Sequence, residues 1–172
     1  PPAGVPTPWC GRVRLAADRS VQEDPDVSSL VSVVRFVVPA LARRIAEAEW
    51  AGSRQLAIGN LDAVRDFLDV RDVVAAYRLL VEKGEPGGAY NVCSGTPVAI
   101  RSVAERLRTL ADADLELVVD PDLVRPVEVP SMVGNPARLA AHTGFAPRFA
   151  LDDTLQAVLD EARDRMRQIS SD

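Results

Sequence analysis

Two arginines in this sequence stand where a guanidinium could bind phosphate. Arg65 is predicted to lie in a loop between a short apolar strand and a helix, and Arg125 precedes Pro126 in a proline-rich segment. A guanidinium presents a fork of donors that matches phosphate oxygens. Glu128, three residues after Arg125, could accept hydrogen bonds from a ribose or a base. These residue types therefore suit recognition of a nucleotide.

A structural interpretation of Arg65 competes with the phosphate interpretation. Arg65 lies close in sequence to Asp62 and Asp69, and pairing with either carboxylate would merely cover the start of a helix. Spacing alone favours this structural interpretation. His142 and Cys93 are expected to be structural, and Ser94 suits a turn as well as a ligand contact.

Several kinds of catalytic and cofactor site are excluded by spacing. No three glycines have the G-x-G-x-x-G spacing of a dinucleotide site. The only lysine, Lys83, follows no glycine as a P-loop requires, and Leu79 stands where a Tyr-x-x-x-Lys pair needs tyrosine. One histidine and two cysteines make neither a zinc site nor a Ser-His triad. We therefore predict no catalytic, cofactor-binding or metal-binding residue in this chain.

Apolar periodicity predicts helices alternating with strands. The expected helices cover about residues 37–50, 70–83, 100–111, 136–144 and 151–167, and the strands 55–59, 89–94 and 115–119. Asp69 is predicted to be the N-cap of the second helix, and Gly84 its stop. This order indicates the α/β class, with small mixed pieces of sheet covered by helices.

Three segments lack a clear period. The first 25 residues contain five prolines and are expected to be irregular, as is the segment 120–135. The run SSLVSVVRFVV (28–38) could be a buried strand or the lead into the next helix. We accordingly divide the chain into an irregular segment, 1–35, and a binding domain, 36–168.

Composition narrows the functional classes. The 172 residues are 47% hydrophobic and 26% charged, typical of a single globular domain. A net charge of -5 argues against general nucleic-acid binding and against a membrane surface. No apolar run is long enough to span a bilayer, so a cytoplasmic location is expected.

Five segments together resemble a known enzyme family. They are FVVPALARRIAEAE, LAIGNLDAVRDFLDVRDVVAAYRLL, AYNVCSG, VRPVEVPSMVGNPARL and TGFAPRFALDDTL, in this order. They resemble the C-terminal half of extended short-chain dehydrogenases/reductases, a superfamily with an NAD(P)-binding Rossmann-like fold. The nearest branch contains GDP-mannose 4,6-dehydratase and GDP-6-deoxy-4-keto-mannose reductase. The resemblance runs from about Phe36 to Arg163.

The resemblance implies substrate-binding roles. In that family the C-terminal region closes over a nucleotide sugar, so Arg65 would contact the diphosphate or ribose. Arg125 would reach the phosphate and Glu128 the guanosine, and Arg44 would border the nucleotide pocket. Arginine also suits such a contact chemically, so the resemblance reverses the earlier preference for a purely structural role of Arg65. NADP or NAD is implied for a full-length relative, not for this chain.

The sequence also departs from the family. Its N-terminal Rossmann half is missing, and SSLVSVVR stands where an Asn-His-x-Gly-Pro-Gly segment is expected. Ala99 replaces the usual N-cap, a loss of about 1 kcal/mol. We therefore expect a truncated GDP-sugar dehydratase or reductase that is inactive alone. The alternatives are a stand-alone sugar-nucleotide-binding module, or an interaction domain that packs on a partner Rossmann half or forms homo-oligomers.

Overall fold

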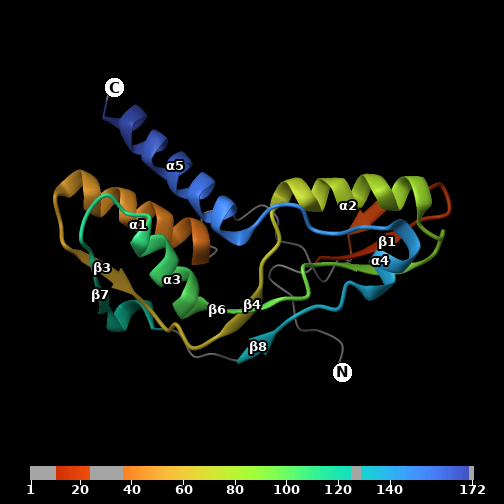
Figure 1. The fold of residues 1–172 in the computed structure, drawn as a ribbon, viewed down its shortest axis with the longest axis horizontal. Helices are drawn as coiled ribbons and strands as arrows, with labels where there is room; N and C mark the ends of the chain where they lie inside the picture. The colour runs from red at the N-terminus through yellow and green to blue at the C-terminus, as the bar shows by residue number, and fades with distance from the viewer. Residues whose placement is uncertain (1–10, 24–36, 125–128, 171–172) are drawn as a thin grey trace. The chain divides into compact units, whose positions relative to one another are not determined.

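The computed structural model describes residues 11–23, 37–124 and 129–170 (Figure 1). As far as they are described, these residues form two compact units built from interleaved segments. Unit 1 draws on Pro1–Val31, Arg65–Pro97 and Met132–Leu151, and unit 2 on Ser32–Val64, Val98–Ser131 and Asp152–Asp172. The sequence-based division into 1–35 and 36–168 cuts the chain at one point, whereas these units interleave, and that division stays a prediction.

Unit 1 contains an antiparallel sheet in the order β2-β1-β5. Its strands are β1 (Gly11–Leu15), β2 (Val21–Glu23) and β5 (Ala89–Val92). Val13 pairs with Glu23 on one side and with Tyr90 on the other. The prediction of irregular chain is therefore wrong for 11–15 and 21–23. β1 is stabilised by pairing with β5, far along the sequence, which a local period cannot reveal, and β2 pairs with β1 in turn.

The helices α2 (Val70–Lys83) and α4 (Ala137–Thr143) complete the core of unit 1. Their buried side chains join those of β1 and β5 in one apolar cluster that includes Val13, Ala76, Leu80, Tyr90 and Leu139. α2 has the predicted bounds, because its apolar residues recur at helical spacing between two good caps. The Asp69 carboxylate accepts a hydrogen bond from the Arg71 N–H at 2.8 Å, which confirms the predicted N-cap.

Unit 2 is built on three helices and a two-stranded parallel sheet. These are α1 (Val37–Ala51), α3 (Ile100–Thr109), α5 (Leu151–Ile169), β3 (Gln55–Ile58) and β7 (Glu116–Val119). α1 packs on both α3 and β3, and β3 pairs with β7 from Gln55↔Glu116 to Ile58↔Val119. Each helix contributes a fully buried side chain to the core of this unit: Ile45 from α1, Leu107 from α3 and Leu155 from α5. The α/β class is confirmed.

A third small sheet has the order β6-β4-β8. Its strands are β6 (Pro97–Ala99), β4 (Val64–Asp66) and β8 (Ser131–Met132). The chain passes between the two units within or next to these strands. Two predictions are corrected here. Arg65 lies in a strand, not in a loop, and the segment 120–135 contains β8 and a 3-10 helix, η3 (Pro121–Leu123).

The N-terminus of α3 is satisfied without a capping side chain. Ala99 makes no such bond, as predicted. The backbone N–H groups of Ile100 and Arg101 instead donate to the carbonyls of Ala63 and Leu61, at 2.9 and 3.1 Å. Two of the donors that a helix start leaves unpaired are thereby bonded, which offsets the cost of alanine at this position.

Among the residues that the structure describes, no helix combines the length and apolarity that crossing a membrane requires.

Candidate functional site

Arg65 occupies the middle of β4, and its side chain is partly exposed. On one side of it, within unit 2, the Val64 N–H donates to the Pro130 carbonyl at 2.8 Å. On the other side, within unit 1, Asp66 is 1% exposed. Arg65 is therefore held by the backbone of a hydrogen-bonded strand, a more rigid support than the predicted loop.

The Asp66 carboxylate is the best-bonded acidic group near Arg65. Its Oδ1 accepts from the Ser94 N–H at 2.9 Å and from the Ser94 hydroxyl at 2.6 Å. Its Oδ2 accepts from the Gly95 N–H at 2.8 Å and from the Gly134 N–H at 3.2 Å. One carboxylate thus joins β4 to the turn after β5 and to the segment after β8. Sequence reasoning missed this role, because the donors lie far along the chain.

Ser94 has the turn role that the sequence allowed. Besides bonding to Asp66, its hydroxyl oxygen accepts from the Thr96 N–H at 3.0 Å. Asn91, in β5, donates through its Nδ2 to the Asn135 carbonyl at 3.4 Å. Both side chains therefore contribute to the local structure of unit 1.

A second buried carboxylate lies in the first turn of α2. Asp72 is 1% exposed and accepts the backbone N–H groups of Arg148 and Phe149, each at 3.1 Å. Next to it, Asp69 binds the Arg71 guanidinium, which lies 3.6 Å from the centroid of the Phe149 ring. An acid in the first turn of a helix interacts favourably with the helix dipole, and this tertiary contact adds to that interaction.

The other predicted substrate-binding residues are not brought together with Arg65 by any described contact. Arg44 lies on α1 in unit 2, where its Nη1 donates to the Ala57 carbonyl of β3 at 3.3 Å. Arg125 and Glu128 lie outside the described residues. Their roles stay predictions.

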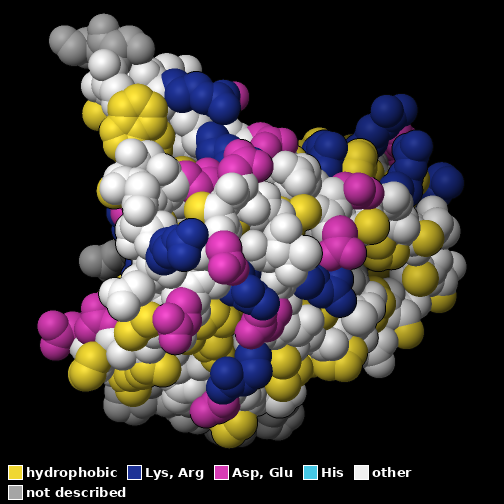
Figure 2. Space-filling model, turned by 60° about the vertical axis from the view of Figure 1, so that its left-hand side comes forward, with side chains coloured by type: hydrophobic (Ala, Val, Ile, Leu, Met, Phe, Trp, Pro, Cys, Tyr) yellow, Lys and Arg dark blue, Asp and Glu magenta, His cyan; other side chains and the backbone are white. Residues whose placement is uncertain are grey.

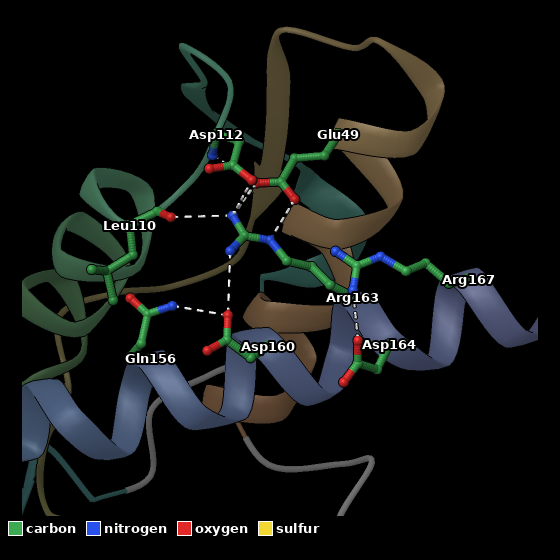
Figure 3. A network of polar contacts seen from close by, with 8 residues as sticks. All are labelled: Glu49, Leu110, Asp112, Gln156, Asp160, Arg163, Asp164 and Arg167. Carbon is green, nitrogen blue, oxygen red and sulfur yellow. Dashed lines mark hydrogen bonds and ion pairs between the residues drawn. The ribbon is translucent and has the colours of Figure 1, made fainter.

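The densest charged network lies in unit 2 around Arg163 of α5 (Figure 3). Its guanidinium donates to both carboxylate oxygens of Glu49, at 2.9 and 2.7 Å, and to the Leu110 carbonyl at 3.2 Å. Asp112 and Asp160 also lie within ion-pair distance. The hydrogen bond from Arg163 lowers the pKa of Glu49, and the bond to Glu49 raises the pKa of Arg163. This network joins α5 to α1 and to the end of α3.

Basic side chains elsewhere on α5 are paired with nearby acids. Arg165 pairs with Glu161, and Arg167 with Asp164. Figure 2 shows blue and magenta side chains intermingled on the face that it brings forward. Such mixing gives no extended field of one sign on that face.

His142 and Cys93 lie in structural positions, as the sequence predicted. The His142 Nδ1 is 3.0 Å from the Tyr90 hydroxyl, and the two rings meet edge to face. Cys93 is fully buried. Neither position points to catalysis.

Sites for a metal ion and for a dinucleotide each need particular residues. Among the described residues, no three His, Cys, Asp or Glu side chains come together as metal ligands. A dinucleotide needs a glycine-rich turn between a strand and the N-terminus of a helix. The residues at the starts of α2 and α3 are Asp69 and Ala99. These helix starts do not fit the pyrophosphate of NAD(P).

Comparison with known families gives a clear match. The sequence model of the family described as GDP-mannose 4,6 dehydratase matches residues 27–158. The chain is 40% identical to GDP-6-deoxy-D-mannose reductase of Pseudomonas aeruginosa over 134 residues, covering 77% of this chain and 44% of the relative. It is 30% identical to GDP-L-fucose synthase 1 of Arabidopsis thaliana, covering 72% of this chain and 38% of the relative.

Solved structures agree with the sequence relatives. The structure of RMD from Pseudomonas aeruginosa complexed with NADPH matches with a TM-score of 0.71 and 38% identity, over 77% of this chain and 44% of that one. The Bordetella bronchiseptica enzyme WbmF in complex with NADH matches with a TM-score of 0.64 and 26% identity, over 81% of this chain and 40% of that one. The chain therefore spans less than half the length of these relatives.

Proposed function

The chain belongs to the GDP-mannose 4,6-dehydratase family, and we propose that it is the part of such an enzyme that binds the nucleotide sugar. The observation that carries the proposal is Arg65, partly exposed on a strand whose next residue, Asp66, is anchored by four hydrogen bonds. A guanidinium on a rigid element can bind a diphosphate with little loss of side-chain and backbone entropy.

The proposal assigns recognition and orientation to this chain. Arg65 contacts the diphosphate or the ribose, Arg125 the phosphate and Glu128 the guanosine, while Arg44 borders the pocket. The reductase and fucose synthase named above carry GDP-sugars in their names, which favours guanosine over other bases. These residues lower the entropy cost of bringing a sugar to a reactive group.

Transfer of protons and hydride is not assigned to residues of this chain. A nicotinamide cofactor, when bound to a full-length enzyme, supplies or accepts the hydride. RMD was solved with NADPH and WbmF with NADH. The starts of α2 and α3, at Asp69 and Ala99, do not fit the pyrophosphate of such a cofactor. We therefore propose that the cofactor is held by residues outside this chain.

Calorimetric titration of the chain with GDP-mannose, GDP and UDP tests the proposal. We expect the two guanosine ligands to bind more tightly than UDP. Arg65→Ala should weaken GDP binding about 10- to 100-fold, because a charge-assisted hydrogen bond contributes about 1.5–3 kcal/mol. Arg125→Ala should have a similar effect.

The matched control is Arg78→Ala, which removes an exposed arginine of unit 1 that pairs with Glu82 on α2. Its affinity for GDP should equal that of the wild type. Absence of binding heat from the wild type, or equal losses in Arg65→Ala and Arg78→Ala, would contradict the proposal.

A further inference from the structure

We propose that Asp66 is a positioning residue that fixes the direction of Arg65 toward the nucleotide diphosphate. This inference rests on the proposed function of Arg65. It concerns a residue that sequence reasoning did not select, and it gives the hydrogen bonds around the Asp66 carboxylate a role in binding as well as in folding.

The Asp66 carboxylate is saturated with hydrogen-bond donors. Two hydrogen bonds reach Oδ1 from Ser94, and one each reaches Oδ2 from Gly95 and Gly134. A carboxylate has about four acceptor positions, so all of them are used. At 1% exposure, a charge held by so many donors cannot rotate without leaving buried N–H groups unpaired.

Arg65 and Asp66 are neighbours in the strand β4. Successive side chains of a β-strand point to opposite faces. With the side chain of Asp66 fixed on the buried face of β4, Arg65 is directed to the other face, where it is partly exposed. A rotation of the strand would move both side chains together. The bonds of Asp66 therefore determine where the guanidinium of Arg65 can reach.

Two segments meet at Asp66: the turn at Ser94 and Gly95, and the segment that contains Gly134. The Gly95 backbone has a φ of 77°, and a Cβ there would lie 2.9 Å from the Cδ of Pro136. The turn at Ser94 and Gly95 is thus closely packed on the segment that contains Gly134. In sequence this segment follows Arg125 and Glu128, the other predicted contacts of the nucleotide. The Asp66 carboxylate therefore joins β4 to the turn after β5 and to the segment that contains Gly134.

The test compares Asp66→Asn with Asp72→Asn. Both side chains are 1% exposed carboxylates of unit 1 that accept backbone N–H groups. In Asp66→Asn an amide nitrogen replaces one acceptor oxygen and leaves donors unpaired, so β4 loses its anchor. We expect GDP-mannose to bind at least about tenfold more weakly, equivalent to the loss of one good hydrogen bond.

The 31P chemical shifts of GDP at saturation supply a readout that reduced stability alone would not change. They should move in Asp66→Asn, because the guanidinium meets the diphosphate differently. Asp72→Asn should lower the urea midpoint but leave the affinity and the 31P shifts of the wild type. If Asp66→Asn does not fold, Ser94→Ala removes the hydroxyl bond to Oδ1, together with the bond from the Thr96 N–H, and should weaken binding about two- to fivefold.

The outcomes separate this inference from the proposed function. Wild-type affinity and 31P shifts in Asp66→Asn, or equal losses in Asp66→Asn and Asp72→Asn, overturn the positioning role while Arg65→Ala can still show weakened binding. Absence of GDP binding by the wild type overturns the proposed function itself.

Discussion

Glu49 and Arg163 form a bidentate pair whose side chains are 14% and 13% exposed. The hydrogen bond from Arg163 holds the pKa of Glu49 below its ordinary value of 4.5. A carboxyl whose pKa is lower in the folded than in the unfolded protein stabilises the fold fully above the unfolded pKa. We therefore predict that this contribution is lost as the pH falls below about 4.5, because the unfolded chain then binds a proton first.

Urea unfolding of the wild type and Glu49→Gln measures this contribution. At about pH 7 the variant should be less stable by about 2 kcal/mol, since Arg163 keeps Asp112 and Asp160 as partners. The difference should shrink as the pH falls below 4.5 toward the lowered pKa of folded Glu49, because the wild-type carboxyl then becomes protonated as well. The control, Glu47→Gln, changes an exposed pair with Arg43 and should stay within about 0.5 kcal/mol. A gap that is independent of pH would contradict the assignment.

At the scale of residues, the sequence identified the N-cap Asp69 from its neighbours, because an acid before a helix has a local meaning. Arg65 was selected only with the help of the family resemblance, and its binding role stays a prediction. The contacts of Asp66, Asp72 and Arg163 could not be identified from neighbours, since their partners are backbone groups and carboxylates distant in sequence. A contact made by folding leaves no local pattern.

At the scale of elements, α2 depends on its first turn. Asp69 accepts one backbone bond and two guanidinium bonds from Arg71 and is 6% exposed. We predict that Asp69→Ala lowers the free energy of unfolding by about 1–2 kcal/mol, through the lost cap. The control is Asp153→Ala, an exposed acid in the first turn of α5, which should change stability by at most about 0.5 kcal/mol. Thermal unfolding compares the two, and equal shifts would contradict a special role for the cap.

The predicted helices were largely confirmed because their burial follows the local period. The prediction for α1 ends at 50 and the helix at Ala51, and α2 has the predicted bounds. The strands β1, β2, β4, β6 and β8 were not predicted. Each has five residues or fewer and pairs with another short strand, so intrinsic preference carries little of the signal.

At the scale of the whole molecule, exposed valines on α2 suggest a surface for association. Val70, Val74 and Val81 are 68%, 63% and 42% exposed, and they recur at helical spacing on a single face. A contiguous apolar face of this kind marks an interaction surface or a tendency to aggregate. The flank of the same helix carries Arg71 near its start and Glu82 near its end. Two antiparallel copies of α2 would therefore bring opposite charges together.

We accordingly predict that the chain self-associates through α2. Sedimentation velocity from about ten to several hundred micromolar should show the average mass rising with concentration. This concentration range suits the weak association that a small interface gives. Val74→Glu places a charge at the centre of the face, so it should abolish the rise in mass. It should not unfold α2, because glutamate has a higher helix propensity than valine. Val124→Glu makes the same change at a 47% exposed valine of unit 2 and should leave association unaltered. A monomeric wild type throughout this range, or equal effects of the two substitutions, would contradict an interface on α2.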